Sequence, residues 1–146
     1  MKKRIHLAIG FVVLLMASLA VMSCGNDDEP ITRQDTSAPY GRWTLMGYVS
    51  DGNFVRYEVS GTRDCYLLLE EDGSYNARFC NLFEGEYSFC QNGEFRFLGG
   101  ISTEMWSTDS NLMFMEKQLR NVTSYGIEGS SLKLYYSQND YLKFSR

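Results

Sequence analysis

Histidine is nearly absent from this chain, which contains it once, at His6. Imidazole is the most common general base near neutral pH and the most common metal ligand in proteins. We expect His6 to be lost with an N-terminal leader segment, which leaves the mature chain without imidazole. This excludes Ser–His–Asp and Cys–His catalytic sites and histidine-based zinc sites. We therefore predict that the protein is not an enzyme and has no catalytic residue, no metal site and no cofactor.

Proline and basic residues are also scarce. Both prolines, Pro30 and Pro39, lie in the polar stretch 25–40, whose composition is typical of a flexible linker. Without the basic residues at positions 2–4, the chain keeps 11 Lys and Arg against 18 Asp and Glu, a net charge of −7. Nucleic acids and anionic lipid surfaces require clustered Lys and Arg. The charge balance therefore predicts that nucleic acid is not a partner.

A long apolar run occurs only at the N-terminus. A basic start, Met1–Arg4, is followed by the uncharged segment Leu7–Val21. A basic cap with about 15 mostly apolar residues fits a signal peptide and is short for a membrane-spanning helix of about 20 residues. A membrane anchor helix that stays in place is the alternative. We interpret residues 1–23 as a lipoprotein signal peptide.

The sequence VMSCG, residues 21–25, ends the apolar run and resembles a bacterial lipobox. A hydrophobic residue stands three positions before Cys24, and small residues flank the cysteine. In the lipoprotein pathway a diacylglycerol is attached to the cysteine thiol, and cleavage leaves that cysteine as the new N-terminus. Several acyl chains hold a protein firmly on a membrane, whereas one binds only marginally. Cys24 is therefore the predicted lipidation site, and the membrane is the predicted partner of its lipid.

An acidic run, NDDE at residues 26–29, follows Cys24 directly. Such runs are usually solvated and flexible, so residues 24–40 are predicted to form an acidic, polar tether. The run also resembles the export signal that sends lipoproteins to the outer face of the outer membrane in some Gram-negative bacteria. We predict a lipid-anchored, surface-exposed protein of the bacterial outer membrane, with the periplasmic face as the alternative.

The remaining segment, 41–146, is predicted to form one mainly β domain. Alternating apolar residues predict short strands, which are separated by Asp-Gly, Glu-Gly and Asn-Gly turn signals. The expected strands are 43–49, 54–59, 65–70, 75–79, 86–89, 94–97, 125–128, 131–136 and 142–145, with turns at 51–52, 72–73, 84–85 and 92–93. One helix is expected at 111–121, capped by Asp109 or Ser110. The pattern predicts a β-rich α+β fold, an antiparallel barrel-like or sandwich domain with one amphipathic helix.

Several motifs in this segment resemble the META domain family, the HslJ-like proteins. They occur in the family's order as GRWTL at 41–45, CNLFEGEY at 80–87, STEM at 102–105 and YGIEG with LKL at 125–134. The motif residues matched are Trp43, Cys80, Asn81, Phe83, Gly85, Tyr87, Thr103 and Met105. The resemblance implies a small, mostly β protein, often an envelope lipoprotein, with no agreed catalytic site. One departure is Ser107, where the family often has a cysteine.

Three cysteines remain if Cys24 is acylated, an odd number for an oxidising compartment. A hairpin at Asp72-Gly73 places Cys65 opposite Cys80, within disulfide range. We predict a Cys65–Cys80 disulfide that leaves Cys90 buried and free. A Cys80–Cys90 pair and three reduced thiols are the alternatives.

The remaining patterns leave three functions open. Close carboxylates occur at 70–72 and at Glu84 and Glu86, which is the minimum that a carboxylate-based hydrolase requires. Tyrosines at 135, 136 and 141 are typical either of a binding surface or of stabilising cross-strand pairs. We predict a membrane-tethered, non-enzymatic module that binds a protein or small ligand or serves in stress protection. A passive structural protein and a carboxylate-based hydrolase are the alternatives.

Overall fold

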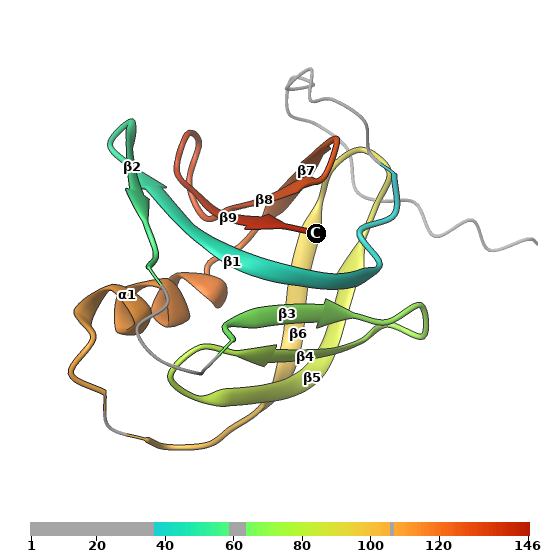
Figure 1. The fold of residues 1–146 in the computed structure, drawn as a ribbon. Helices are drawn as coiled ribbons and strands as arrows, with labels where there is room; N and C mark the ends of the chain where they lie inside the picture. The colour runs from blue at the N-terminus through green and yellow to red at the C-terminus, as the bar shows by residue number, and fades with distance from the viewer. Residues whose placement is uncertain (1–36, 59–63, 106) are drawn as a thin grey trace, which may run out of the picture.

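A computed structural model describes residues 37–58, 64–105 and 107–146 (Figure 1). Within these ranges the chain forms nine strands and a single helix. The elements are β1 Gly41–Ser50, β2 Asn53–Arg56, β3 Tyr66–Leu69, β4 Ser74–Arg78, β5 Leu82–Phe89, β6 Phe95–Ser102, α1 Ser110–Leu119, β7 Ser124–Glu128, β8 Ser131–Tyr135 and β9 Tyr141–Ser145. The predicted signal peptide, Cys24 and most of the predicted tether lie outside the described residues. In the described part, no helix is long and apolar enough to cross a membrane.

All strands belong to one antiparallel sheet, in the order β6-β5-β4-β3-β1-β9-β8-β7, with β2 paired to the end of β1. The sheet curls so that its two edge strands approach each other, and α1 lies beside it (Figure 1). At one end the edges meet, because the amide of Phe95 donates to the carbonyl of Thr123 at 3.0 Å and that of Tyr125 to Gly93 at 2.8 Å. Among the described residues, the rest of β6 pairs only with β5. The predicted β-rich, barrel-like class is therefore confirmed, as a half-barrel that is closed at one end.

The core lies inside the curled sheet, where alternate side chains of the strands point inward. Trp43 is fully buried and its indole nitrogen donates to the carbonyl of Pro39 at 2.7 Å. In β8 and β9, Leu132 pairs with Phe144 and Leu134 with Leu142, as predicted from their alternation. These side chains have no exposed surface. Alternate residues of a strand point to opposite faces of the sheet, so the period-two pattern of apolar residues predicted these strands correctly.

Helix α1 begins where its sequence signals place it. The carboxylate of Asp109 accepts hydrogen bonds from the amides of Asn111 and Leu112, both at 3.0 Å, and so acts as the N-cap. The buried face of the helix consists of Leu112, Met115 and Leu119. One predicted helix over this segment is confirmed, and its apolar stripe packs on the core.

The predicted turn at Glu84-Gly85 is wrong, because β5 runs straight through it. The chain turns earlier, between the end of β4 at Arg78 and the start of β5 at Leu82. Gly85 serves another purpose: a Cβ at this position would lie 2.0 Å from the carbonyl oxygen of Gly99 and 2.9 Å from the ring of Tyr75. The glycine is needed for the close approach of β5 and β6.

The predicted Cys65–Cys80 disulfide is also wrong, since both are free thiols, which excludes the Cys80–Cys90 alternative as well. In the β3–β4 pair, Tyr66 lies opposite Arg78, so Cys65 continues the register opposite Phe79 rather than Cys80. A one-residue shift places a side chain on the other face of a sheet. Cys90 is disulfide-bonded, so the prediction of a free Cys90 is wrong too.

Candidate functional site

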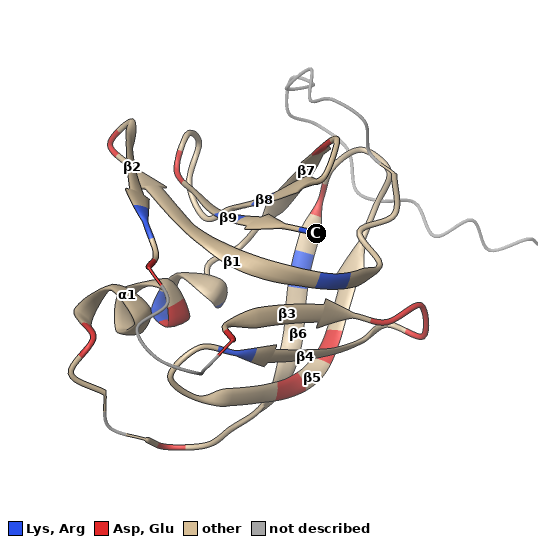
Figure 2. Ribbon diagram, viewed as in Figure 1, with Lys and Arg blue, Asp and Glu red and all other residues tan. Residues whose placement is uncertain are grey.

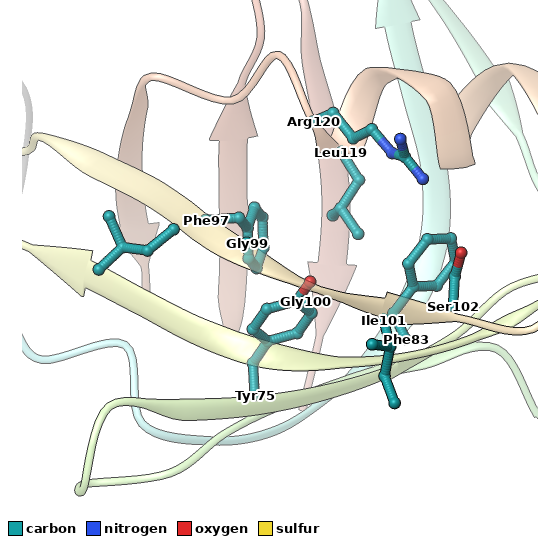
Figure 3. A pocket seen from close by; sticks show the side chains of 10 residues that line it. Tyr75, Phe83, Phe97, Gly99, Gly100, Ile101, Ser102, Leu119 and Arg120 are labelled. Carbon is teal, nitrogen blue, oxygen red and sulfur yellow. The ribbon is translucent and has the colours of Figure 1, made fainter.

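A hollow lies at the open end of the half-barrel, between the free part of β6 and the end of α1. We call it the β6–α1 cavity. Its volume is about 380 Å³, within the range typical of small-molecule sites. Figure 3 shows the side chains around it. They are Tyr75, Phe83, Phe97, Leu98, Gly99, Gly100, Ile101, Ser102, Leu119 and Arg120.

Two glycines shape the wall that β6 contributes. Gly100 lies opposite Gly85 in the β5–β6 pair, and a Cβ on Gly100 would lie 2.3 Å from the carbonyl oxygen of Glu84. Gly99 and Gly100 have φ values of 134° and 153°, and the register shifts by one residue just beyond them. A Cβ on Gly99 would meet nothing within 4 Å, and both glycines line the cavity. No sequence motif marks FLGGIS, residues 97–102, as a site.

Aromatic and aliphatic groups form most of the cavity wall. The rings of Tyr75 and Phe97 pack edge to face, with centroids 4.6 Å apart. At the rim, Leu98 is 59% and Ile101 is 75% exposed. Large apolar side chains that are this exposed are a feature of binding sites when they gather around a hollow. The cavity is therefore suited to an apolar group.

Among the described residues, Arg120 is the only charged one that lines the cavity. Its guanidinium makes no hydrogen bond or ion pair with any described residue. Burial raises the pKa of the Tyr75 phenol, and the positive charge of Arg120 opposes that rise. No carboxylate lines the cavity, so an anionic group of a ligand would meet an uncompensated cation beside apolar walls. No sequence motif marked Arg120, because the cavity forms only when α1 packs beside β6.

A buried amide holds the segments around the cavity together. The side chain of Asn81 donates to a carboxylate oxygen of Glu116 on α1 at 2.8 Å, and its backbone amide donates to the other oxygen at 3.2 Å. The Asn81 carbonyl oxygen accepts from the amide of Met105 at 2.6 Å and from the hydroxyl of Thr103 at 3.1 Å. We call this set the Asn81 clamp. It ties the β4–β5 turn, the segment after β6 and α1 to one another.

The predicted motif residues divide into three structural roles. Trp43, Phe83 and Tyr87 are core residues, each at most 5% exposed, and the Tyr87 hydroxyl donates to the carbonyl of Glu70 at 2.7 Å. Gly85 provides the close approach of two strands. The clamp unites the other motif residues: Asn81, its neighbour Cys80, Thr103 and Met105. Of the motif, only Phe83 also lines the β6–α1 cavity.

The carboxylates proposed for hydrolysis lie elsewhere. Glu70, Glu71 and Asp72 are exposed at the β3–β4 turn, and Glu84 and Glu86 are exposed on β5. Figure 2 shows that acidic residues lie mainly at turns and on the outer surface. Hydrogen bonds from Ser74 lower the pKa of Asp72, which is an ordinary effect of turn geometry.

The tyrosines near the C-terminus make contacts that stabilise the sheet. Tyr135 and Tyr141 lie opposite each other across β8 and β9, with ring centroids 5.2 Å apart. The hydroxyl of Tyr136 donates to the carbonyl of Val49 at 2.7 Å, and burial raises its pKa to about 12. These contacts favour cross-strand stabilisation over a binding surface.

The curled antiparallel sheet with one helix defines a class of small β domains, and comparison with known proteins places the chain within it. The META domain family model matches residues 36–146, and the chain belongs to this family. A search of curated proteins finds no match.

Three solved structures share the fold. One, determined by NMR, is 20% identical, with a TM-score of 0.56, 73% of this chain covered and 88% of the other. A DUF4847 family protein from Bacteroides vulgatus is 13% identical, with a TM-score of 0.53 and coverage of 72% and 91%. An NMR structure of a protein from Burkholderia xenovorans is 16% identical, with a TM-score of 0.57 and coverage of 83% and 98%. At these identities the likeness concerns the fold alone.

Proposed function

We propose that this META-domain protein is a lipid-anchored binding module that takes up a small amphipathic ligand, with an apolar body and one anionic group, in the β6–α1 cavity. The observation that carries the proposal is the guanidinium of Arg120, which has no hydrogen-bond or ion-pair partner in the described part of the chain and lies beside the apolar wall of Tyr75, Phe97 and Leu119. A cation next to a low-polarity wall interacts with an anion more strongly than it does in bulk water.

Binding without catalysis is the function that the residues at the cavity support. Acid–base catalysis needs a group that exchanges a proton within reach of the reacting atom. The cavity wall offers Tyr75, whose pKa is raised by burial, and Arg120, whose guanidinium has hydrogen-bond donors and no acceptor. Ser102 also lines the wall, but no histidine occurs in the described residues to activate it.

The lipid anchor rests on the lipobox-like sequence VMSCG and on the acidic run behind Cys24. We propose that the domain is held at the bacterial outer membrane through Cys24 and is displayed at the cell surface. A thioether to diacylglycerol and a disulfide use the same sulfur, so the proposal requires that the Cys24 sulfur carries the lipid in the mature protein.

Ligand binding is tested with two fluorescent probes that share an aromatic apolar body. Anilinonaphthalene sulfonate carries an anionic group, whereas N-phenylnaphthylamine is neutral. Arg120→Gln is expected to weaken binding of the anionic probe by about tenfold, equivalent to about 1.4 kcal/mol, and to leave the neutral probe unchanged. Ile101→Glu, which adds a negative charge at the rim, should also weaken binding of the anionic probe. Ile101→Gln is its matched control.

Two results would contradict this function. Equal binding of the anionic probe to the wild type and Arg120→Gln would remove the role of the cation. No saturable binding of either probe would favour a passive structural protein. Near-ultraviolet circular dichroism of each variant distinguishes lost binding from lost packing.

Lipidation is tested by metabolic labelling of intact cells with an alkyne fatty acid. The wild type and Cys90→Ser should incorporate the label, and Cys24→Ser should not. Label retained in Cys24→Ser, or a Cys24–Cys90 crosslink mapped in the mature protein, would overturn the anchor. Protease treatment of whole cells then distinguishes surface display from the periplasmic face.

A further inference from the structure

A second, smaller hollow shares Arg120 with the β6–α1 cavity and is lined by residues of the Asn81 clamp. We call it the sulfur cavity. Its volume is about 260 Å³, and it is lined by Cys80, Asn81, Met105, Met113, Glu116, Lys117 and Arg120. Three of these residues carry sulfur, and they come from three separate segments: the β4–β5 turn, the stretch after β6, and α1. Packing of the core does not explain this gathering, because Met105 is 51% and Met113 is 46% exposed.

The backbones of all three sulfur residues lie at or near the Asn81 clamp. Cys80 directly precedes Asn81, and the amide of Met105 donates to the Asn81 side chain at 2.6 Å. Met113 lies one helical turn before Glu116, whose carboxylate holds Asn81. The backbone of Met105 is thus bonded to the buried amide and the other two lie close to it along the chain, while the two thioether side chains keep the freedom of exposed methionines to adjust around a ligand.

We propose that Cys80, Met105 and Met113 form a binding site for a soft monovalent cation, Cu(I) or Ag(I). Thiolate and thioether ligands select soft metal ions. The thiol of Cys80 is free and half-buried, with a raised pKa caused mainly by burial. No cluster of three His, Cys, Asp or Glu in the described residues could hold a metal ion, and the two methionines supply the donors that such a cluster lacks.

The charges around the sulfur cavity favour a monovalent ion over a divalent one. Binding forms one metal–sulfur bond to Cys80 and releases its thiol proton to water, while the thioethers donate neutral lone pairs and no electron is transferred. One thiolate neutralises one positive charge. Lys117 and Arg120 add positive charge to the wall, and both oxygens of Glu116 already accept hydrogen bonds from Asn81. A divalent ion would keep an uncompensated charge beside these cations.

The experiment is a titration of the full chain in detergent with Ag(I), in chloride-free buffer, and with Cu(I) against a competing chelator. One equivalent should bind. Cys80→Ser should weaken the binding at least about 100-fold, and Met105→Leu and Met113→Leu about tenfold each, while Zn(II) should bind far more weakly. Met46→Leu, at a half-buried methionine of β1, and Cys65→Ala, at a buried free thiol, are the matched controls and should bind like the wild type.

A spectroscopic measurement separates a three-sulfur site from a thiol that binds alone. With the methionine methyl groups labelled by carbon-13, Ag(I) should shift the resonances of Met105 and Met113 and leave those of Met46 and Met115 in place. Wild-type affinity in both Leu variants, or unshifted methyl resonances, would overturn the proposal, as would wild-type affinity in Cys80→Ser. The leucine substitutions keep size and apolarity, so loss of the fold does not confuse the result.

Discussion

The two halves of strand β6 differ sharply, although they belong to one element. At the closed end Phe95 is fully buried. The centroid of its ring lies 5.4 Å from that of the Tyr87 ring and 6.0 Å from that of the Tyr125 ring. At the open end of the same strand, Leu98 and Ile101 are largely exposed beside a cavity. The difference follows from what lies beside the strand, since only the first half meets β7. Stability is therefore expected from the closed end and binding from the open end.

A substitution at the closed end is expected to cause the largest loss in the free energy of unfolding. Phe95→Ala should destabilise the domain by about 3–5 kcal/mol, because it removes a fully buried ring and leaves a cavity. Ile101→Ala, in the same strand at the open end, should cost less than about 0.5 kcal/mol, as exposed positions do. Urea unfolding followed by circular dichroism measures both. Similar losses for the two variants would remove the distinction between the ends.

A substitution at Gly85, where β5 and β6 approach closely, is expected to cause the next largest loss in the free energy of unfolding. Gly85→Ala should destabilise by about 1–3 kcal/mol, since the new methyl group would overlap the carbonyl of Gly99 and the strands must separate. Gly126→Ala is the control, because its Cβ would meet only the ring of Tyr135 at an ordinary 3.7 Å. Gly85→Ala should also alter probe binding in the β6–α1 cavity, where Gly99 forms part of the wall.

The Asn81 clamp gives an effect that depends on pH. Asn81→Asp places a second carboxylate against Glu116, which loses its 2.8 Å amide partner. Two ionised carboxylates repel, so the destabilisation should be about 1–3 kcal/mol at pH 7. It should shrink as the pH falls below about 5, where one carboxylate takes up a proton. Unfolding at pH 7 and pH 4 tests the sign, and adding Glu116→Gln should abolish the pH dependence of the difference.

The smallest expected effect is a difference between the free thiols of Cys65 and Cys80 in their rate of alkylation. Burial raises the pKa of both Cys65 and Cys80, so each holds less thiolate at pH 7.5 than an ordinary cysteine. Cys65 is 2% exposed and donates to the hydroxyl of Tyr57 at 3.4 Å. Iodoacetamide should therefore modify Cys80 at least about tenfold faster, because Cys65 requires local opening. Mass spectrometry of timed samples follows both rates, which should rise with pH up to the thiol pKa values. Faster modification of Cys65 would contradict the assigned burial.

Much of the fold was predictable because local patterns in this chain agree with its tertiary structure. The alternation of Leu132 and Leu134 with Leu142 and Phe144 identified two facing strands, and Asp109 identified the start of α1. The errors arose where a local signal competes with packing. Glu84-Gly85 reads as a turn because Gly tolerates unusual backbone angles, but the glycine lies in mid-strand to admit a neighbouring backbone.

The sequence by itself determined the helix and most of the strands, because these depend on side-chain periodicity and local turn and cap signals. Its ordered motifs indicated the META domain family by their resemblance to that family. Only the tertiary structure decided the β3–β4 register, and with it that Cys65 and Cys80 stay apart. It also decided that Arg120 faces the free half of β6, and that Cys80, Met105 and Met113 line one cavity. Such groupings depend on the angle and depth at which distant segments pack, which local patterns do not specify.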